Sequence, residues 1–391
     1  MDIYHRAIEL REETLHHRRY FHEHAEVGTE LPTACAYVEK ELRACGIEPS
    51  RCGCGITATV GSGEPVILLR ADMDALPMAE ESGLPFACKS GKAAHTCGHD
   101  LHAAMLLTAA KLLKERENDL RGTVKLMFQP GEEPLTGCRE MLEAGVLSDP
   151  KPQAALACHV AAGRTEAGLL LYNDSSTMMF SVNNFMITVH GRGAHGAYPQ
   201  DAVDPINIGV HIHLALQALI AREVSPMDAC ALTVGQFAAG SAPNIIPETA
   251  VLKGTLRSGR KEVQEKLVRR LREVAEGTAA VFGGRAEVTL LTEIPPLRCD
   301  GETVRELEGY ARELPALRTA GGLEASASED FALIAEQIPS AYFYLTAGFA
   351  DERGGYPAHH PKVLFSEDVL PLGAAVYAHG ALRWLEEHAH P

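Results

Sequence analysis

The sequence predicts an α/β protein of two domains, in which a smaller α+β domain interrupts a larger domain built on a mixed sheet. The chain has 391 residues, whereas single hydrophobic cores stop growing at roughly 250–300 residues. Apolar strands in its first half end in ionisable side chains, as strands do at the ligand crevice of an open α/β sheet. Further along, the order of elements changes to β-α-β-β-α-β, which is typical of a compact α+β sandwich.

Composition and charge exclude several classes of protein. Hydrophobic residues make up 46% and charged residues 23%, a balance typical of globular enzymes. The net charge of -16 disfavours nucleic acid and anionic lipid as partners. Residues 2–19 are too charged for a secretory signal, and no apolar run reaches the length of a membrane span. The ten cysteines lack the spacing of a disulfide scaffold, so we expect reduced thiols and a cytoplasmic location.

The first elements of the larger domain follow from hydrophobic periodicity and capping residues. A helix is predicted over residues 31–45, because Pro32 stands in its first turn and Gly46 follows its end. Residues 103–114 repeat apolar side chains with the period of an amphipathic helix. Apolar runs predict three buried strands, over residues 66–69, 123–129 and 154–158.

The middle of the chain predicts the inserted domain. Strands are expected over residues 185–189, 231–237, 249–256 and 286–291. Helices are expected over residues 204–224 and 261–282. This order is that of a ferredoxin-like sandwich, and the segment is small enough to be a self-contained insertion.

The C-terminal part of the chain predicts elements that lack a core of their own. We expect Ser328 to cap a helix that runs through Gln337. A strand over residues 341–346 and helices from Ser366 should follow, and these elements should complete the first sheet. The predicted domains are therefore a larger one of residues 1–181 and 294–391, and an inserted one of residues 182–293.

The stretch His95-Thr96-Cys97-Gly98-His99-Asp100-Leu101-His102 concentrates side chains that bind metals. It precedes an expected helix, whose N-terminal dipole favours the thiolate form of Cys97. Cys97 and His99 can converge on one ion because the chain is not yet expected to be helical there, whereas positions i and i+2 of a helix diverge. A solvated histidine-rich loop is the alternative interpretation.

Ionisable side chains at the ends of the three strands favour the metal interpretation. In chain order they are Asp72 and Asp74, the pair Glu132-Glu133, and His159. Since such strands end at one crevice, these side chains should converge. Adjacent carboxylates that leave a strand point in different directions, so one can bind a metal while its neighbour reaches a water; a turn with two solvated acids is the alternative. A later loop, residues 355–361, adds the imidazoles of His359 and His360.

Together these residue types predict a centre for two divalent ions with one bridging group. The thiolate, imidazole and carboxylate ligands would be Cys97, His99, Glu133, His159 and His359. Two ions a few Å apart can polarise a carbonyl and lower the pKa of a shared water. Glu132 is then the candidate general base, and later acid, that moves a proton from water to a leaving amine. Zinc or manganese is expected, and nickel or cobalt stays open.

Asp72 is interpreted as a supporting residue rather than as a ligand. A ligating imidazole such as His99 needs a partner on its other nitrogen, and a carboxylate often fills this role. From the residues alone, a plain salt bridge between Asp72 and Arg70 is equally compatible.

Five motifs resemble, in order, those of the di-metal amidohydrolase and metallopeptidase family. They cover residues 70–77, 95–100, 128–133, 193–199 and 359–361. The family includes aminoacylases, hippurate hydrolases, auxin-conjugate hydrolases and glutamate-releasing carboxypeptidases. The resemblance implies a metallopeptidase catalytic domain with an inserted lid domain that also forms a homodimer. It implies the same five metal ligands, with Cys97 bridging, and the acid/base role of Glu132.

Three lid residues take their roles from the resemblance alone. It implies that His195 reaches across the dimer to polarise the scissile carbonyl or to stabilise its oxyanion. It also implies that Asn244 and Arg257 hold the substrate. From the local sequence alone, a capping role for Asn244 and a surface position for Arg257 are the alternatives. Pro134 and Cys138 depart from the small residues usual after the Glu pair, near the expected pocket wall.

We therefore expect a cytoplasmic, homodimeric metallohydrolase that cleaves the amide of an N-acyl amino acid to a carboxylate and a free amino acid. Within the family, a dipeptidase or carboxypeptidase and an N-acetyl-diaminopimelate deacetylase are alternatives. A thiol hydrolase with Cys97 as nucleophile is an alternative of another class. A metal-buffering protein would also explain the histidines, but it leaves the spare carboxylate of Glu132 without a role.

Overall fold

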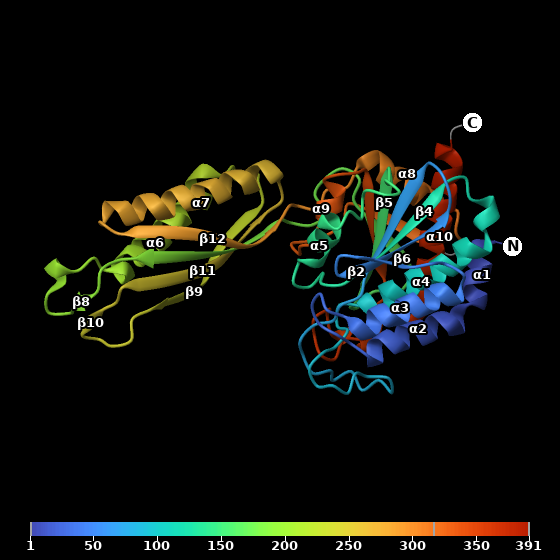
Figure 1. Cartoon of the computed structure of the whole chain (residues 1–391), viewed down its shortest axis with the longest axis horizontal. Coiled ribbons are helices and arrows are strands. Elements are labelled where there is room, and N and C mark those ends of the chain that lie inside the picture. Colours follow the sequence, from blue (N-terminus) through green and yellow to red (C-terminus); the bar gives the residue numbers. More distant parts are fainter. Residues whose placement is uncertain (1, 316, 390–391) are drawn as a thin grey trace. The chain divides into compact units, whose positions relative to one another are not determined.

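The computed structural model describes residues 2–315 and 317–389, and the described chain forms two compact units. The larger unit comprises the chain up to Met178, Arg298–Glu324 and the chain from Asp330 onward. The smaller unit comprises Met179–Leu297 together with Ala325–Glu329. Each unit has its own sheet and its own helices (Figure 1).

The larger unit is built on a mixed sheet of eight strands in the order β1-β2-β4-β3-β5-β14-β6-β13. The strands are β1 Ser50–Cys52, β2 Gly55–Gly61, β3 Val66–Asp72, β4 Thr123–Gln129, β5 Ala154–Ala161, β6 Leu169–Tyr172, β13 Arg318–Gly321 and β14 Ser340–Thr346. Parallel pairing joins β3 to β4 and β5, and β5 to β14, whereas β2 is antiparallel to β4 and β6 to β14. The predicted mixed sheet is confirmed.

Helices bury the central strands of this sheet. Every residue of β3 and β4 is buried, which explains why these strands read as continuous apolar runs rather than as alternating ones. The α-helices are α1 Ile3–Glu9, α2 Arg11–Glu23, α3 Pro32–Ala44, α4 His99–Glu115, α5 Gly137–Glu143, α8 Gly301–Ala311, α9 Ala332–Ala335 and α10 Leu370–His388. Both α4 and α10 pack on β3 and on each other, and α2 and α3 pack against α4 (Figure 1).

The smaller unit is an antiparallel sheet with two helices. Its strands lie in the order β12-β7-β11-β9, namely Arg285–Ile294, Val182–His190, Thr249–Ser258 and Cys230–Ala239. Helices α6 Pro205–Glu223 and α7 Lys261–Val281 contact each other and share one hydrophobic core with the sheet. Chain order is β-α-β-β-α-β, as predicted, with an added ribbon of β8 Ala194–His195 and β10 Ile245–Ile246. Asp204 caps α6 through the amides of its first turn.

The prediction for Ser328 was wrong. The helix α9 begins only after Phe331. Among the described residues it has no side-chain cap, and the buried Ser328 hydroxyl has no hydrogen-bond partner. The reason is that the preceding backbone is extended: Ala325 bridges Met179, and Ala327 accepts a hydrogen bond from Phe180 N. This pairing holds the segment out of a helical conformation.

None of the described helices has the length and apolar character that crossing a bilayer would require.

Candidate metal centre

The loop before α4 brings the thiol and the first imidazole together. Gly98 caps the helix with a φ of 96°, a left-handed conformation that favours glycine. A Cβ at this position would lie only 2.4 Å from Cγ2 of Val160. His99 is the first residue of α4, although we expected it to precede the helix. Its convergence with Cys97 still holds, because the left-handed turn at Gly98 separates the two.

The first group of donor atoms comprises Cys97, His99 and His159, whose ligand atoms all lie within 4.8 Å of one another. His159 lies within β5 rather than after it, and its Nε2 is 3.5 Å from Cys97 Sγ. Nδ1 of His159 donates to the Val160 carbonyl at 2.7 Å, and Nδ1 of His99 donates to the Asp74 carbonyl at 2.8 Å. These bonds orient both imidazoles so that Nε2 faces the group.

The second group comprises Cys97, Glu133 and His359, again within 4.8 Å of one another. Nε2 of His359 lies 3.4 Å from Cys97 Sγ and 3.5 Å from Glu133 Oε1. His359 has a φ of 66°, and its backbone N–H donates to the Thr96 carbonyl at 2.9 Å. A left-handed conformation is uncommon for a residue other than glycine and is often found at functional sites.

The residues present fit a pair of cations. Cys97 belongs to both groups, and thiolate, imidazole and carboxylate are the donors that zinc takes. Nε2 of His99 and Oε1 of Glu133 are buried and make no hydrogen bond within the described chain. Leaving such atoms unpaired costs free energy, whereas a cation between them would satisfy both.

The electrostatics of the site also favour positive charge. Against the effect of burial, the Asp72 carboxylate raises the pKa of His99 well above its usual range. Burial raises the pKa of the Cys97 thiol, and the nearby His99 opposes this only in part. The expected help from the helix N-terminus is thus outweighed by desolvation, and such a thiol loses its proton when a cation binds.

Asp74 holds the backbone of the two adjacent glutamates of the site. Its Oδ1 accepts from the amide of Glu132 at 2.9 Å, and its Oδ2 accepts from the amide of Glu133 at 3.0 Å. Glu132 is 7% exposed, and its Oε2 lies 3.9 Å from Nε2 of His99. Sequence reasoning noted Asp74 only as a strand-end acid; the signal for its role was its position two residues after Asp72.

The expected contact of Asp72 was wrong in one respect. Its Oδ1 accepts from Nδ1 of His102 at 2.5 Å, whereas Nδ1 of His99 is already bonded to a carbonyl. Its Oδ2 lies 3.9 Å from Nε2 of His99 and accepts from Arg70 at 2.6 Å. Burial opposes the charged form, but His99, Arg70 and His102 together hold the pKa of Asp72 well below its usual range. Asp72 therefore makes both a salt bridge with Arg70 and a hydrogen bond with His102.

A buried polar network lies behind Asp72. Arg70 donates to Gln129 and to Asp330, each at 3.0 Å, and Gln129 donates to Asp330 at 2.8 Å. The other oxygen of Asp330 accepts from the Cys138 amide at 3.1 Å. The side chain of Cys138 is fully buried.

Three predicted residues lie in the smaller unit. His195, in β8, is exposed, and its Nδ1 accepts from the amide of Ala197 at 3.0 Å. Asn244 lies beside this strand, since its carbonyl accepts from the amide of Gly196 at 2.8 Å. Arg257 lies on β11; its buried Nη1 makes no hydrogen bond to any residue that the structure describes, and burial lowers the pKa of its guanidinium. The structure therefore brings His195 and Asn244 together.

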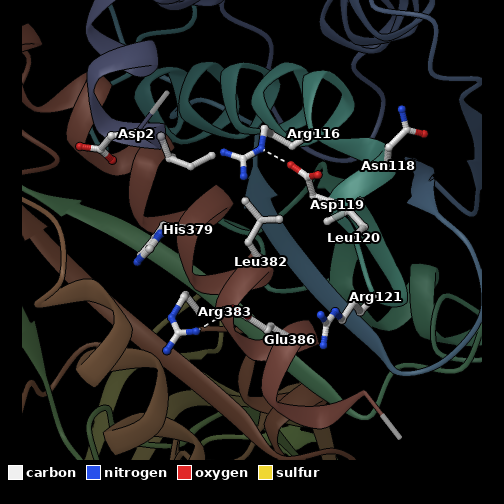
Figure 2. Close-up of a pocket in the computed structure, with 11 residues that line it drawn as sticks. Asp2, Arg116, Asn118, Asp119, Leu120, Arg121, His379, Leu382, Arg383 and Glu386 are labelled. Atoms are coloured by element: carbon white, nitrogen blue, oxygen red, sulfur yellow. Dashed lines mark hydrogen bonds and ion pairs between the residues drawn. The ribbon is translucent and has the colours of Figure 1, made fainter. Parts of the chain in front are cut away.

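A pocket of about 580 Å³ lies on the larger unit (Figure 2). Its lining comes from the N-terminus, the chain after α4 and the helix α10, and includes none of the predicted site residues. Arg116 pairs with Asp119 and Arg383 pairs with Glu386 within it. We assign no activity to this pocket.

Comparison with known proteins identifies the family. Residues 68–383 match the model of peptidase family M20/M25/M40. The chain belongs to this family. It is 34% identical over 379 residues to an N-acetyl-L-cysteine deacetylase of Bacillus subtilis, covering 95% of this chain and 88% of that protein. It is 36% identical over 384 residues to the IAA-amino acid hydrolase ILR1-like 2 of Arabidopsis thaliana, covering 95% and 85%.

A solved structure extends this similarity to three dimensions. The crystal structure of a Bacillus subtilis protein, described as a dinuclear metal-binding peptidase of the M20 family, matches with a TM-score of 0.81 at 30% identity. The match covers 97% of this chain and 99% of the other. The predicted family, the α/β fold and the class of metal-dependent amidohydrolase are confirmed for this M20 chain.

Proposed function

We propose that this M20 enzyme hydrolyses the amide bond of N-acyl amino acids, releasing a carboxylate and a free amino acid, with two divalent cations at Cys97. The observation that carries the proposal is that Cys97 belongs to two donor groups at once, one with His99 and His159 and one with Glu133 and His359. A bridged pair of cations needs a ligand that both can share, and a thiolate that belongs to both groups can be that ligand.

The roles of the residues follow from their places in the site. His99 and His159 would hold one cation, Glu133 and His359 the other, and Cys97 both. When bound, the cations supply Lewis acidity toward the scissile carbonyl and lower the pKa of the attacking water. The carboxylate of Glu132 would take a proton from that water and pass it to the leaving amine. Asp74 keeps Glu132 in place for this transfer through its amide.

The substrate class is supported by the names of two relatives. One is named for N-acetyl-L-cysteine and the other for conjugates of IAA with amino acids, and both names describe an amino acid that carries a further group. A dipeptidase or carboxypeptidase, or an N-acetyl-diaminopimelate deacetylase, is the alternative, which the description of the solved relative as a peptidase supports.

We further propose that residues 182–293 form a lid and a dimerisation domain. The helix α6 exposes Ile206, Val210 and Leu214, which recur every four residues on one face. The edge strand β9 adds the exposed Phe237. An apolar face of this kind supports pairing with a second copy. In the dimer, His195 would act on the scissile carbonyl in the site of the partner subunit, and Asn244 and Arg257 would hold the substrate.

The identity of the cations and the location belong to the same proposal. A thiolate with several imidazoles suits zinc, and manganese, nickel or cobalt can also take this mixed donor set. A cytoplasmic location is supported by the ten cysteines, all of which are free thiols in the structure.

The decisive experiment measures release of free amino acid from acetyl, benzoyl and long-chain acyl amino acids and from dipeptides. Chelator-treated enzyme is compared with enzyme reconstituted with Zn²⁺ or Mn²⁺, and with the variant Glu132→Gln. We expect release that needs the metal, and a variant that keeps its metal content but loses turnover. Release that survives chelation would favour the thiol hydrolase, and metal binding without turnover on any substrate would favour a metal-buffering protein.

A further inference from the structure

His102 is a buried histidine of the metal-binding stretch that the proposed function leaves without a role. It is 1% exposed and lies in the first turn of α4. Both of its ring nitrogens are bonded. Nδ1 lies 2.5 Å from Oδ1 of Asp72, and Nε2 accepts from the backbone N–H of Val160 at 2.8 Å.

These two bonds determine the tautomer of His102. A backbone N–H can only donate, so Nε2 must present its lone pair to Val160. The ring proton is then on Nδ1, where the Asp72 carboxylate accepts it. His102 is therefore a neutral imidazole with both nitrogens occupied.

The same geometry argues against His102 as a metal ligand. Asp72, His99 and His102 have donor atoms close together, but two atoms that bind one tetrahedral zinc at about 2.0–2.1 Å lie roughly 3.3 Å apart. The Nδ1 to Oδ1 distance of 2.5 Å leaves no room for a cation and is that of a short hydrogen bond.

The bond to Val160 reaches the predicted ligand His159. Val160 follows His159 in β5, and its carbonyl accepts from Nδ1 of His159 at 2.7 Å. Fixing Val160 therefore fixes the atom that anchors the His159 ring, whose Nε2 points to Cys97 Sγ at 3.5 Å. The rings of His102 and His159 also pack together, with centroids 4.4 Å apart.

We propose that His102 is a positioning residue for one of the two cations, the one held by Cys97, His99 and His159. It acts through a chain of contacts that runs from Arg70 and Asp72 through His102 to the Val160 peptide and the His159 ring. The other cation, at Glu133 and His359, lies outside this chain. The inference rests on the proposed di-metal site but does not depend on which amide the enzyme cleaves.

The test compares His102→Leu with His102→Gln by titrating chelator-treated protein with Zn²⁺ or Co²⁺ in a calorimeter. Leucine can neither accept from Val160 nor donate to Asp72, whereas glutamine can do both. We expect wild-type protein to bind two cations. His102→Leu should lose about 10–100-fold in affinity for one cation and keep the other, and His102→Gln should recover most of the loss.

A matched control removes a buried histidine elsewhere in the larger unit. His17 is 4% exposed and bonds the Tyr37 hydroxyl at 2.8 Å. His17→Leu should lower the melting temperature without changing either affinity. If His102→Leu bound both cations with wild-type affinity, or lost affinity for both to the same extent, the proposal would be overturned.

A measurement on the unchanged protein keeps the proposal testable if His102→Leu does not fold. Nitrogen-15 NMR of the histidine rings, assigned with His102→Gln, should show the neutral Nδ1–H tautomer at His102; an Nε2–H or doubly protonated ring would overturn the proposal. Wild-type protein that binds two cations but cleaves no amide would refute the proposed function alone, and wild-type protein that binds none would refute both.

Discussion

The Sγ atom of Cys97 lies 3.4 Å from Nε2 of His359, although 262 positions separate the two residues in the chain. His359 reaches this place in a left-handed conformation, with its backbone N–H bonded to the carbonyl of Thr96. Such a conformation costs on the order of 1 kcal/mol or more for a residue with a side chain. The fold therefore holds this imidazole against a local preference, directly beside the shared thiol.

The sharing of Cys97 gives the first prediction. Cys97→Ala should abolish binding of both cations, because the thiol belongs to both donor groups. His359→Ala should remove only one cation, because His359 belongs to one group. Metal content per chain after dialysis, measured by mass spectrometry, distinguishes the variants. Two cations retained by Cys97→Ala would contradict a bridging thiol.

The left-handed turn at Gly98 gives the second prediction. Gly98→Ala adds a Cβ at 2.4 Å from Val160 to a backbone φ of 96°. Strain and overpacking together should lower the free energy of unfolding by roughly 2–5 kcal/mol and weaken cation binding. Gly63→Ala is the matched control, since Gly63 has a φ of 82° with no atom within 4 Å. It should cost about 1 kcal/mol in urea unfolding, and equal costs for the two variants would contradict the role of the close contact.

The two hydrogen bonds that Asp74 accepts from the amides of Glu132 and Glu133 give the third prediction. Asp74→Asn keeps one acceptor oxygen and turns an amide group toward the second backbone N–H, so the turn that carries Glu132 and Glu133 must shift. Misplacing a catalytic group by about 1 Å can cost about 10²-fold in rate. We expect kcat to fall by about that factor in metal-saturated enzyme. Asp351→Asn, at an exposed pair with Arg353, is the control and should leave kcat unchanged.

The buried His22 gives a prediction for pH. Its imidazole bonds Asp100 and Glu80, each at 2.8 Å, and against the effect of burial these carboxylates raise its pKa to about 9 from 6.5. Because the pKa is raised on folding, protonated His22 stabilises the folded state. This contribution is fully present below pH 6.5 and is lost as the pH rises through 9. The loss should be roughly 3 kcal/mol.

Urea unfolding at pH 6, 7.5 and 9.5 checks this expectation. The stability of the wild type should fall across the series, whereas that of His22→Gln should not follow it. Asp100 and Glu80 have lowered pKa values, so their own contributions change at acidic pH instead. His24→Gln, at an exposed histidine whose ring bonds the Tyr20 carbonyl and no carboxylate among the described residues, should behave like the wild type. Parallel curves for wild type and His22→Gln would contradict the assigned pKa.

Local pattern was enough to predict much of the fold. The apolar runs before Asp72 and Glu132 predicted β3 and β4, because strands buried on both faces leave a continuous signal. The predicted helix cap at Ser328 was wrong because it depended on a local signal alone. Its capping signal is local, but the backbone around it pairs with Met179 and Phe180, which are distant in sequence. A tertiary contact of this kind leaves no trace in the neighbouring residues.

The candidate site shows the same division. The donor types at Cys97 and Glu133 could be predicted, because Cys97 stands just before a predicted helix and Glu133 follows a predicted strand. The histidine partner of Asp72 could not be predicted. His99 and His102 lie three positions apart on α4, and only the packing of this helix decides which imidazole bonds the carboxylate. Asp74 was missed because it acts on backbone amides 58 and 59 positions away.

The proposed crossing of His195 between subunits gives the last prediction. If the His195 of one subunit serves the site of the other, Glu132→Gln and His195→Ala should each be nearly inactive alone. Mixed after dissociation and reassociation, they should recover about a quarter of wild-type activity, because half of the dimers are mixed and each has one complete site.

Leu214→Glu provides the control for assembly. It places a charge on the exposed apolar face of α6, so it should yield monomers by ultracentrifugation and lose activity without losing metal. Activity that is not restored in the mixed sample would place His195 and Glu132 in the same subunit's site. A Leu214→Glu variant that stays dimeric would show that the interface does not include this face of α6, because a carboxylate buried there without a partner costs several kcal/mol.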